Sequence, residues 1–158
     1  MRLLREHSAS PVADVAAFVD ALIFNWLILG TDAHAKNYSM LHQQGGRPRL
    51  APLYDLASVL PYPDAERDAG RLKLAMSVGS EYRDRNIRRR HWIELAENLR
   101  LSADTTLARA TELAQRIGPG AALVRDELVA QGLDHPIVPR LAEKLAARAD
   151  ACLRMLNA

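Results

Sequence analysis

The feature that most limits the fold of this chain is its apolar segment at residues 15–29. Apolar side chains recur there at three- and four-residue intervals, the spacing of one face of an α-helix. They belong to Val15, Phe18, Val19, Leu22, Ile23, Trp26 and Leu27. Ser10 and Pro11 are typical of a helix start. Because Asp20 and Asn25 interrupt the segment, it is too polar for a membrane span and indicates a buried helix.

A dense polar cluster follows this helix directly, in the stretch LGTDAHAKNYSML at residues 29–41. Gly30 is a typical helix end, so the cluster begins just past it. A carboxylate, an imidazole, an ammonium and an amide then come within six residues; they belong to Asp32, His34, Lys36 and Asn37. Two interpretations stay open for these residues. They are either ordinary turn residues or the start of an active site.

Two short runs around Gly45 and Gly46 predict a β-hairpin, with arms at residues 38–41 and 49–53. The second arm brings Asp55 close to the end of its strand. Because a hairpin folds back on itself, we expect Asp55 to return near Asn37 despite a separation of 18 residues.

The rest of the chain is predicted to be mainly helical. Residues 71–76 are expected to form a short strand, and the arginine-rich stretch at residues 81–90 a connector. Four helices are expected at residues 91–99, 102–118, 119–131 and 136–157, with Ser102 as a cap and Gly118 as a stop. The predicted fold class is therefore mainly α, with one small β-hairpin.

Composition fits one globular domain over residues 1–158, because half of the residues are hydrophobic and a quarter are charged. A net charge of +2 gives no strong attraction to nucleic acid or to a membrane surface. Cys152 is the only cysteine and cannot form an intrachain disulfide, which fits a reducing compartment. The first ten residues lack the apolar run of a signal peptide. We therefore expect a cytoplasmic protein.

The spacing of Asp32 and Asn37, D-x-x-x-x-N, is that of a protein-kinase catalytic loop. In such loops the Asp accepts the proton of the substrate hydroxyl and the Asn holds Mg²⁺. A further Asp after a hairpin completes the metal site, and Asp55 is placed for that role. Lys36 would put a positive charge near the phosphoryl group transferred from ATP.

These residues also carry a resemblance to a known family. The stretches FNWLILGTDAHAKNYSM, RLAPLYDLAS and KLAMSVG resemble the C-terminal lobe of HipA-type kinases, the toxin half of bacterial toxin–antitoxin pairs, along nearly the whole chain. The resemblance implies a serine/threonine protein kinase with a largely helical C-terminal lobe. It implies Asp32 as catalytic base, and Asn37 and Asp55 as Mg²⁺ ligands. It also places His34 and Lys36 in the same site.

The resemblance further implies partners and a missing part. The partners would be a helix-turn-helix antitoxin and a protein substrate such as an aminoacyl-tRNA synthetase. DNA would be contacted only indirectly, through the antitoxin. No glycine-rich phosphate loop is present, and no lysine precedes Lys36. In the family these parts lie upstream, so we expect a C-terminal portion that needs an N-terminal nucleotide-clamping lobe, in cis or in trans.

Other functions remain open from the sequence. One is a non-catalytic remnant that keeps a surface for an antitoxin or another partner. Another is a metal-dependent phosphohydrolase, or a zinc site, built on Asp32, His34 and Asp55. The arginines at residues 83–90 would bind phosphate, RNA or the antitoxin, or form a solvated face. Lys73 lies in the family-like KLAM stretch, but the sequence assigns it no role.

Overall fold

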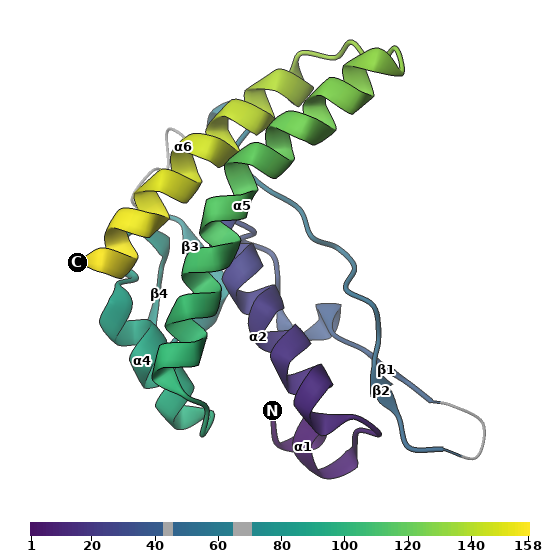
Figure 1. Cartoon of the computed structure of the whole chain (residues 1–158), viewed down its shortest axis with the longest axis vertical. Helices are drawn as coiled ribbons and strands as arrows, with labels where there is room; N and C mark the ends of the chain where they lie inside the picture. The colour runs from purple at the N-terminus through teal and green to yellow at the C-terminus, as the bar shows by residue number, and fades with distance from the viewer. Residues whose placement is uncertain (43–45, 65–70) are drawn as a thin grey trace.

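The computed structural model describes residues 1–42, 46–64 and 71–158. Figure 1 shows a mainly helical molecule, which confirms the predicted fold class. The helices are α1 (Arg2–His7), α2 (Pro11–Leu27), α4 (Arg89–Asn98), α5 (Ala103–Ala130) and α6 (Ile137–Asn157), with 3₁₀ turns η1 (Ala35–Asn37) and η2 (Asp84–Asn86). The strands are β1 (Met40–Leu41), β2 (Arg49–Leu50), β3 (Lys73–Val78) and β4 (Glu81–Arg83). Among the described residues, no helix is long and apolar enough to cross a membrane.

Helix α2 runs through the centre of the fold and confirms the predicted buried helix. It begins at Pro11, as expected, although the Ser10 side chain forms no capping hydrogen bond. Trp26 of α2 and Trp92 of α4 are both fully buried, and their ring centroids lie 5.3 Å apart. The core around this aromatic pair also takes residues from α5 and α6, including the buried, free Cys152. The four longer helices therefore share one apolar core.

The longest helices, α5 and α6, lie side by side, and their connected ends extend beyond the rest of the molecule (Figure 1). The predicted helix stop at Gly118 is wrong, because α5 continues through Pro119 to Ala130. A proline inside a helix removes one hydrogen bond and costs roughly 3 kcal/mol. The α6 helix packs against this stretch, where Gly118 lies opposite Ala146. Tertiary packing thus outweighs the local helix-breaking signal.

The described residues form two separate antiparallel sheets, whereas the sequence predicted one small β element. The first is the predicted hairpin, in which Met40 pairs with Leu50. Its strands are shorter than the predicted runs, and Gly45 of the expected turn lies outside the described residues. The second sheet pairs β3, which was predicted, with β4, which was not. The stretch interpreted as a connector therefore contributes a strand, a 3₁₀ turn and the start of α4.

Gly79 lies in the turn between β3 and β4, where the chain packs closely against α4. Its φ angle is +58°, a conformation that side chains with a Cβ atom rarely adopt. A Cβ atom there would lie 2.6 Å from Glu94 Oε2 and 2.8 Å from the carbonyl oxygen of His91. Both the backbone angle and the space therefore require glycine at this turn.

We predict opposite effects for the same substitution at two glycines. Gly79→Ala should lower the free energy of unfolding by about 1–3 kcal/mol, because it forces a strained φ angle and a close contact. Gly120→Ala should raise it by about 0.5–1 kcal/mol, because that glycine lies inside α5 and its Cβ atom would meet nothing within 4 Å. Urea denaturation followed by circular dichroism measures both changes. Shifts of the same sign would contradict this account.

Candidate active site

The candidate site begins where α2 ends. Leu29 has a φ angle of +55°, and the main-chain N–H of Gly30 donates to the carbonyl oxygen of Asn25 at 2.7 Å. A Cβ atom on Gly30 would lie 2.5 Å from Asn25 Oδ1. A larger residue at this position would therefore crowd the Asn25 side chain where the chain turns back against its own helix. This turn directs the next residues, including Asp32, away from the core.

The loop after this turn is held by its own main chain. The N–H of His34 donates to the carbonyl oxygen of Asp32 at 2.8 Å, and the N–H of Asn37 donates to that of His34 at 2.9 Å. The side chains of Asp32, His34 and Lys36 are exposed, whereas Asn37 is only 8% exposed. The loop thus presents three polar side chains to solvent and turns one inward.

The buried amide of Asn37 connects this loop to Asp55. Its Nδ2 donates to Asp55 Oδ2 at 2.8 Å and to the main-chain carbonyl oxygen of Asp32 at 3.3 Å. The predicted return of Asp55 to Asn37 is therefore confirmed. Asp32 joins the group through its main chain, and its carboxylate forms no hydrogen bond with a described residue. His34 and Lys36 lie on the same loop, and their side chains form no hydrogen bond or ion pair with a described residue.

Two hydroxyl groups hold the segment around Asp55, and the sequence analysis did not identify either of them. The Tyr54 hydroxyl donates to the carbonyl oxygen of Lys36 at 3.1 Å. The Ser58 hydroxyl donates to the carbonyl oxygen of Ile28, the C-cap residue of α2, at 2.5 Å. Asp55 lies between these two contacts and has a φ angle of +57°. Such a left-handed angle costs energy in a residue other than glycine and persists where the surroundings impose it.

Asp14 fixes the hairpin to the start of α2. Its carboxylate accepts hydrogen bonds from Arg49 Nη2 at 2.8 Å, from the N–H of Leu50 at 2.8 Å and from the Ser8 hydroxyl at 2.5 Å. The Asp14 residue is only 3% exposed. The hydrogen bond from Arg49 is the largest cause that lowers the pKa of Asp14, to about 2. The sequence contains a signal for the role of Asp14. This residue precedes Phe18 by one helical turn, so it places a carboxylate on the apolar face of the helix.

The donor set at Asn37 and Asp55 fits a hard divalent cation. A carboxylate and an amide oxygen are ligands that Mg²⁺ accepts alongside its waters. The Oδ1 atoms of both side chains form no hydrogen bond with a described residue, so both remain available. The zinc or phosphohydrolase alternative would need Asp32, His34 and Asp55 together. These three do not form a metal-binding group, and no other three His, Cys, Asp or Glu side chains do so in the part of the chain that the structure describes.

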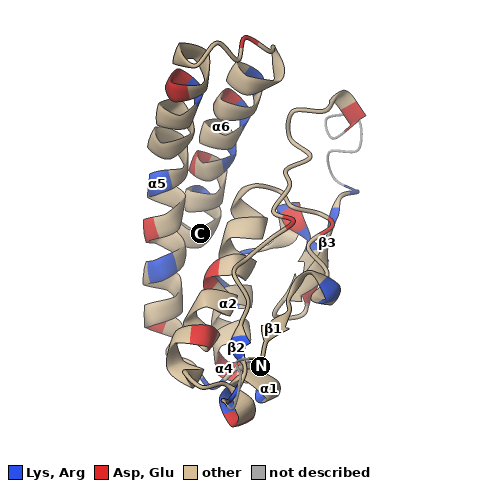
Figure 2. Ribbon diagram, turned by 90° about the vertical axis from the view of Figure 1, so that its right-hand side faces the viewer, with Lys and Arg blue, Asp and Glu red and all other residues tan. Residues whose placement is uncertain are grey.

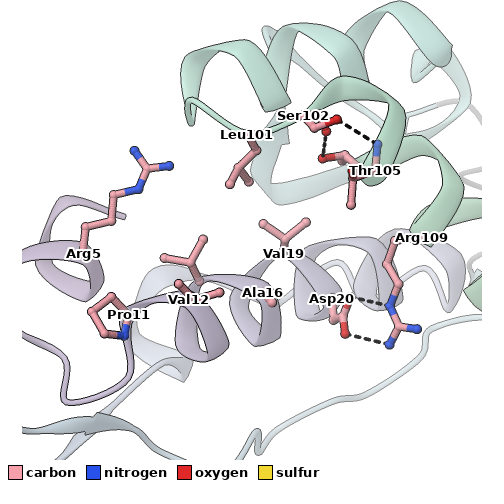
Figure 3. Close-up of a pocket in the computed structure, with 12 residues that line it drawn as sticks. Arg5, Pro11, Val12, Ala16, Val19, Asp20, Leu101, Ser102, Thr105 and Arg109 are labelled. Atoms are coloured by element: carbon pink, nitrogen blue, oxygen red, sulfur yellow. Dashed lines mark hydrogen bonds and ion pairs between the residues drawn. The ribbon is translucent and has the colours of Figure 1, made fainter.

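An apolar pocket of about 580 Å³ lies away from this site (Figure 3). It opens between α1, the first half of α2 and the start of α5, with Val12, Val19 and Leu101 in its lining. At one end of this pocket, Asp20 and Arg109 form a double ion pair with both contacts at 2.8 Å. Asp32 follows the opposite end of α2, so this pocket is separate from the loop that carries the candidate catalytic residues.

Comparison with known proteins decides the family. The model of the HipA-like C-terminal domain matches residues 1–120, and these residues include the whole candidate site. The chain belongs to this family. The predicted resemblance is therefore confirmed for the HipA-like domain.

Two curated relatives of this HipA-like chain show how far the similarity extends. "Putative kinase Y4mE" of Sinorhizobium fredii is 33% identical over 147 residues, which cover 93% of this chain and 34% of that protein. The serine/threonine-protein kinase toxin HipA of Shewanella oneidensis is 32% identical over 108 residues, which cover 68% of this chain and 24% of that protein. The HipA-like chain thus spans about a third or less of the length of these relatives.

A solved structure shows the same relation in three dimensions. It is the complex of HipA, HipB and operator DNA from the Shewanella oneidensis toxin–antitoxin system. The TM-score is 0.75 at 27% identity, over 93% of this chain and 33% of the solved one. The similarity therefore extends beyond residue 120 into the α5–α6 pair.

We predict that Asp14→Asn loosens the hairpin and destabilises the chain by about 2 kcal/mol or more at neutral pH, because buried groups lose a charged partner. The pKa of Asp14 is lowered in the folded state, so its stabilising effect is present above the unfolded pKa. That effect is lost as pH falls toward about 2. The difference in unfolding free energy between wild type and Asp14→Asn should therefore shrink between about pH 4 and pH 2. A difference that does not change with pH would contradict the role of the Asp14 carboxylate.

Proposed function

We propose that this chain is the C-terminal catalytic lobe of a HipA-like serine/threonine protein kinase, which transfers the γ-phosphoryl group of ATP to a protein hydroxyl. The observation that carries the proposal is the 2.8 Å contact between Asn37 and Asp55. It joins a loop with the spacing of a kinase catalytic loop to a carboxylate that follows a hairpin. The membership in the HipA-like family supports the same reading.

Asp32 is the proposed general base. It is exposed on a loop whose main chain is held by hydrogen bonds, so a substrate hydroxyl can reach its carboxylate. A fixed loop matters because phosphoryl transfer depends mainly on positioning and electrostatic stabilisation. Lys36, four residues further along the same loop, supplies a positive charge near the transferred group. His34 lies between them and is proposed to belong to the same site.

Asn37 and Asp55 are proposed to hold Mg²⁺ together with bound ATP. The metal would supply charge neutralisation at the phosphate oxygens. The chain's own contribution is to hold both side chains in place before the ion binds. Tyr54 and Ser58 do so on either side of Asp55, and the burial of Asn37 restricts its amide.

The partners of this chain are proposed by analogy. The solved relative is a complex of HipA with HipB and operator DNA, which supports an antitoxin as partner of this chain too. A helix-turn-helix antitoxin and a protein substrate such as an aminoacyl-tRNA synthetase remain proposals. The 158 residues contain no glycine-rich phosphate loop, so the proposed kinase also requires a nucleotide-clamping lobe.

We predict that residues 1–158 alone transfer phosphate to protein poorly, because nothing in them clamps the phosphates of ATP. Fusion to the nucleotide-clamping lobe of a HipA relative should restore transfer. In the restored enzyme Asp32→Ala should lower kcat by about 10²–10⁴-fold, the usual contribution of a positioned general base. Transfer of labelled γ-phosphate to a protein substrate measures this.

Asp134→Ala is the matched control, because Asp134 is also an exposed aspartate and lies in the connection between α5 and α6. It should leave the rate unchanged. Robust transfer by residues 1–158 alone would show that no further lobe is needed. An Asp32→Ala fusion as active as the wild-type fusion would exclude Asp32 as the general base. A wild-type fusion that transfers no phosphate would favour a non-catalytic, partner-binding domain.

A separate prediction concerns the metal. Asp55→Asn in the same fusion should raise the Mg²⁺ concentration for half-maximal activity by about tenfold or more, because one anionic ligand is lost. Titration of activity with Mg²⁺ at saturating ATP measures this shift. The Asp134→Ala control should titrate like the wild type, and an unchanged Mg²⁺ dependence of Asp55→Asn would exclude Asp55 as a ligand.

A further inference from the structure

Five exposed cations lie within residues 73–90, in the second sheet and in the chain that leads from it into α4; we call them the cationic surface. They are Lys73, Arg83, Arg85, Arg89 and Arg90. They come from β3, β4, η2 and the first turn of α4, and the ribbon around β3 carries basic residues in Figure 2. Residues 73–90 contain six cations and two acids, although the whole chain has a net charge of only +2. The positive charge is therefore local.

Two cations of this surface oppose each other within the sheet. Lys73 of β3 is the direct partner of Arg83 of β4 in the antiparallel register. Both side chains are exposed, and like charges at directly opposite positions destabilise a sheet. The pair therefore contributes no stability to the folding of this small sheet.

The first turn of α4 shows the same conflict. Arg88 is its N-cap residue, Arg89 and Arg90 follow, and the turn contains no acid. The N-terminus of a helix carries partial positive charge, so cations there are unfavourable and acids are preferred. Local rules of this kind are broken mainly where function requires it. The sheet and the start of α4 thus both carry cations at positions where local electrostatics disfavours them.

The three acids within residues 81–94 are already engaged in holding the fold. Glu81 accepts a hydrogen bond from Asn86 Nδ2 at 3.1 Å and two more from the main-chain N–H groups of Tyr82 and Arg83. Asp84 pairs with Arg148 of α6 at 2.9 Å, and both side chains are 10% exposed. Glu94 accepts from the Ser80 hydroxyl at 2.9 Å. The five cations consequently form no ion pair with any described acid.

We propose that the cationic surface binds the phosphodiester backbone of a nucleic acid. A backbone offers anions at regular intervals, so it can neutralise cations that are spread over four elements, which a single phosphate ion could not. Its charge would relieve the repulsion between Lys73 and Arg83 and the conflict at the start of α4.

This inference does not depend on the proposed kinase activity. It also departs from the expectation that DNA reaches this chain only through an antitoxin. DNA and RNA share the chemistry that the surface recognises, because both present phosphodiesters to arginine and lysine. The experiment below uses a DNA probe and an RNA probe to distinguish between these two nucleic acids.

The test measures binding of the 158-residue chain to a short labelled DNA duplex of mixed sequence and to a labelled RNA hairpin, by fluorescence anisotropy. Salt is varied between about 50 and 200 mM. The variants Lys73→Gln/Arg83→Gln and Arg89→Gln/Arg90→Gln should each weaken binding several-fold and reduce the slope of log K against log salt by about two. Their thermal midpoints should stay equal or rise, because repulsion within the fold is removed.

Arg2→Gln/Arg116→Gln is the matched control. It removes the same number of charges, from side chains that are 89% and 69% exposed and lie on α1 and α5. It should bind like the wild type. Binding to DNA, to RNA or to both supports the proposal and identifies the source of the backbone. Lack of binding to both probes at the lowest salt, an equal loss in the control, or tighter binding to a polyglutamate peptide would overturn it.

Discussion

The burial of α2 is the constraint on which the rest of this structure depends. Its apolar face meets α4, α5 and α6 around the contact between Trp26 and Trp92. A helix held on several sides cannot shift or rotate without disturbing a close-packed core. Its last turn is therefore a fixed point, and the loop that carries Asp32 starts from it. Hydrophobic packing of α2 therefore sets the position of the loop that carries the candidate catalytic residues.

From this fixed point the site is completed by polar contacts of modest individual strength. Asn37 connects the loop to Asp55, and Tyr54 and Ser58 hold the segment on either side. Each such bond contributes only about 1 kcal/mol to folding. Their combined effect is geometric, because they restrict two metal-ligand candidates to one place before any ligand arrives. Preorganisation of this kind is what an electrostatic catalyst requires.

The sequence was sufficient for the parts that rest on periodicity and local turn chemistry. The helical spacing of Val15 to Leu27, the glycine after it and the two arms of the first hairpin all carry strong local signals. The contact between Asn37 and Asp55 followed from the hairpin alone. Roles for Asp32, His34 and Lys36 rest on family resemblance and on spacing, because their exposed side chains form no hydrogen bond or ion pair with a described residue that would define a role.

The features that the sequence analysis did not predict have a common physical cause. Each depends on contacts with residues that are distant in the sequence. Gly118 and Pro119 are strong stop signals locally, but α6 supplies packing that keeps α5 continuous. Strand β4 lies in an arginine-rich stretch and exists because β3 offers it a partner. The contact between Asp14 and Arg49 joins residues 35 positions apart. No local pattern states which of several arginines would reach that carboxylate.

The length of α2 also sets a distance within the fold. The segment from Arg49 to Ser58 is attached to the helix twice, through Asp14 near its start and through Ile28 at its end. Those two attachment points are separated by about 21 Å along a helix that rises 1.5 Å per residue. Adding or removing one residue between them would change the span and rotate Asp14 by about 100° relative to Ile28. The length of this helix in whole residues, as much as the identity of its side chains, therefore sets where Asp55 stands.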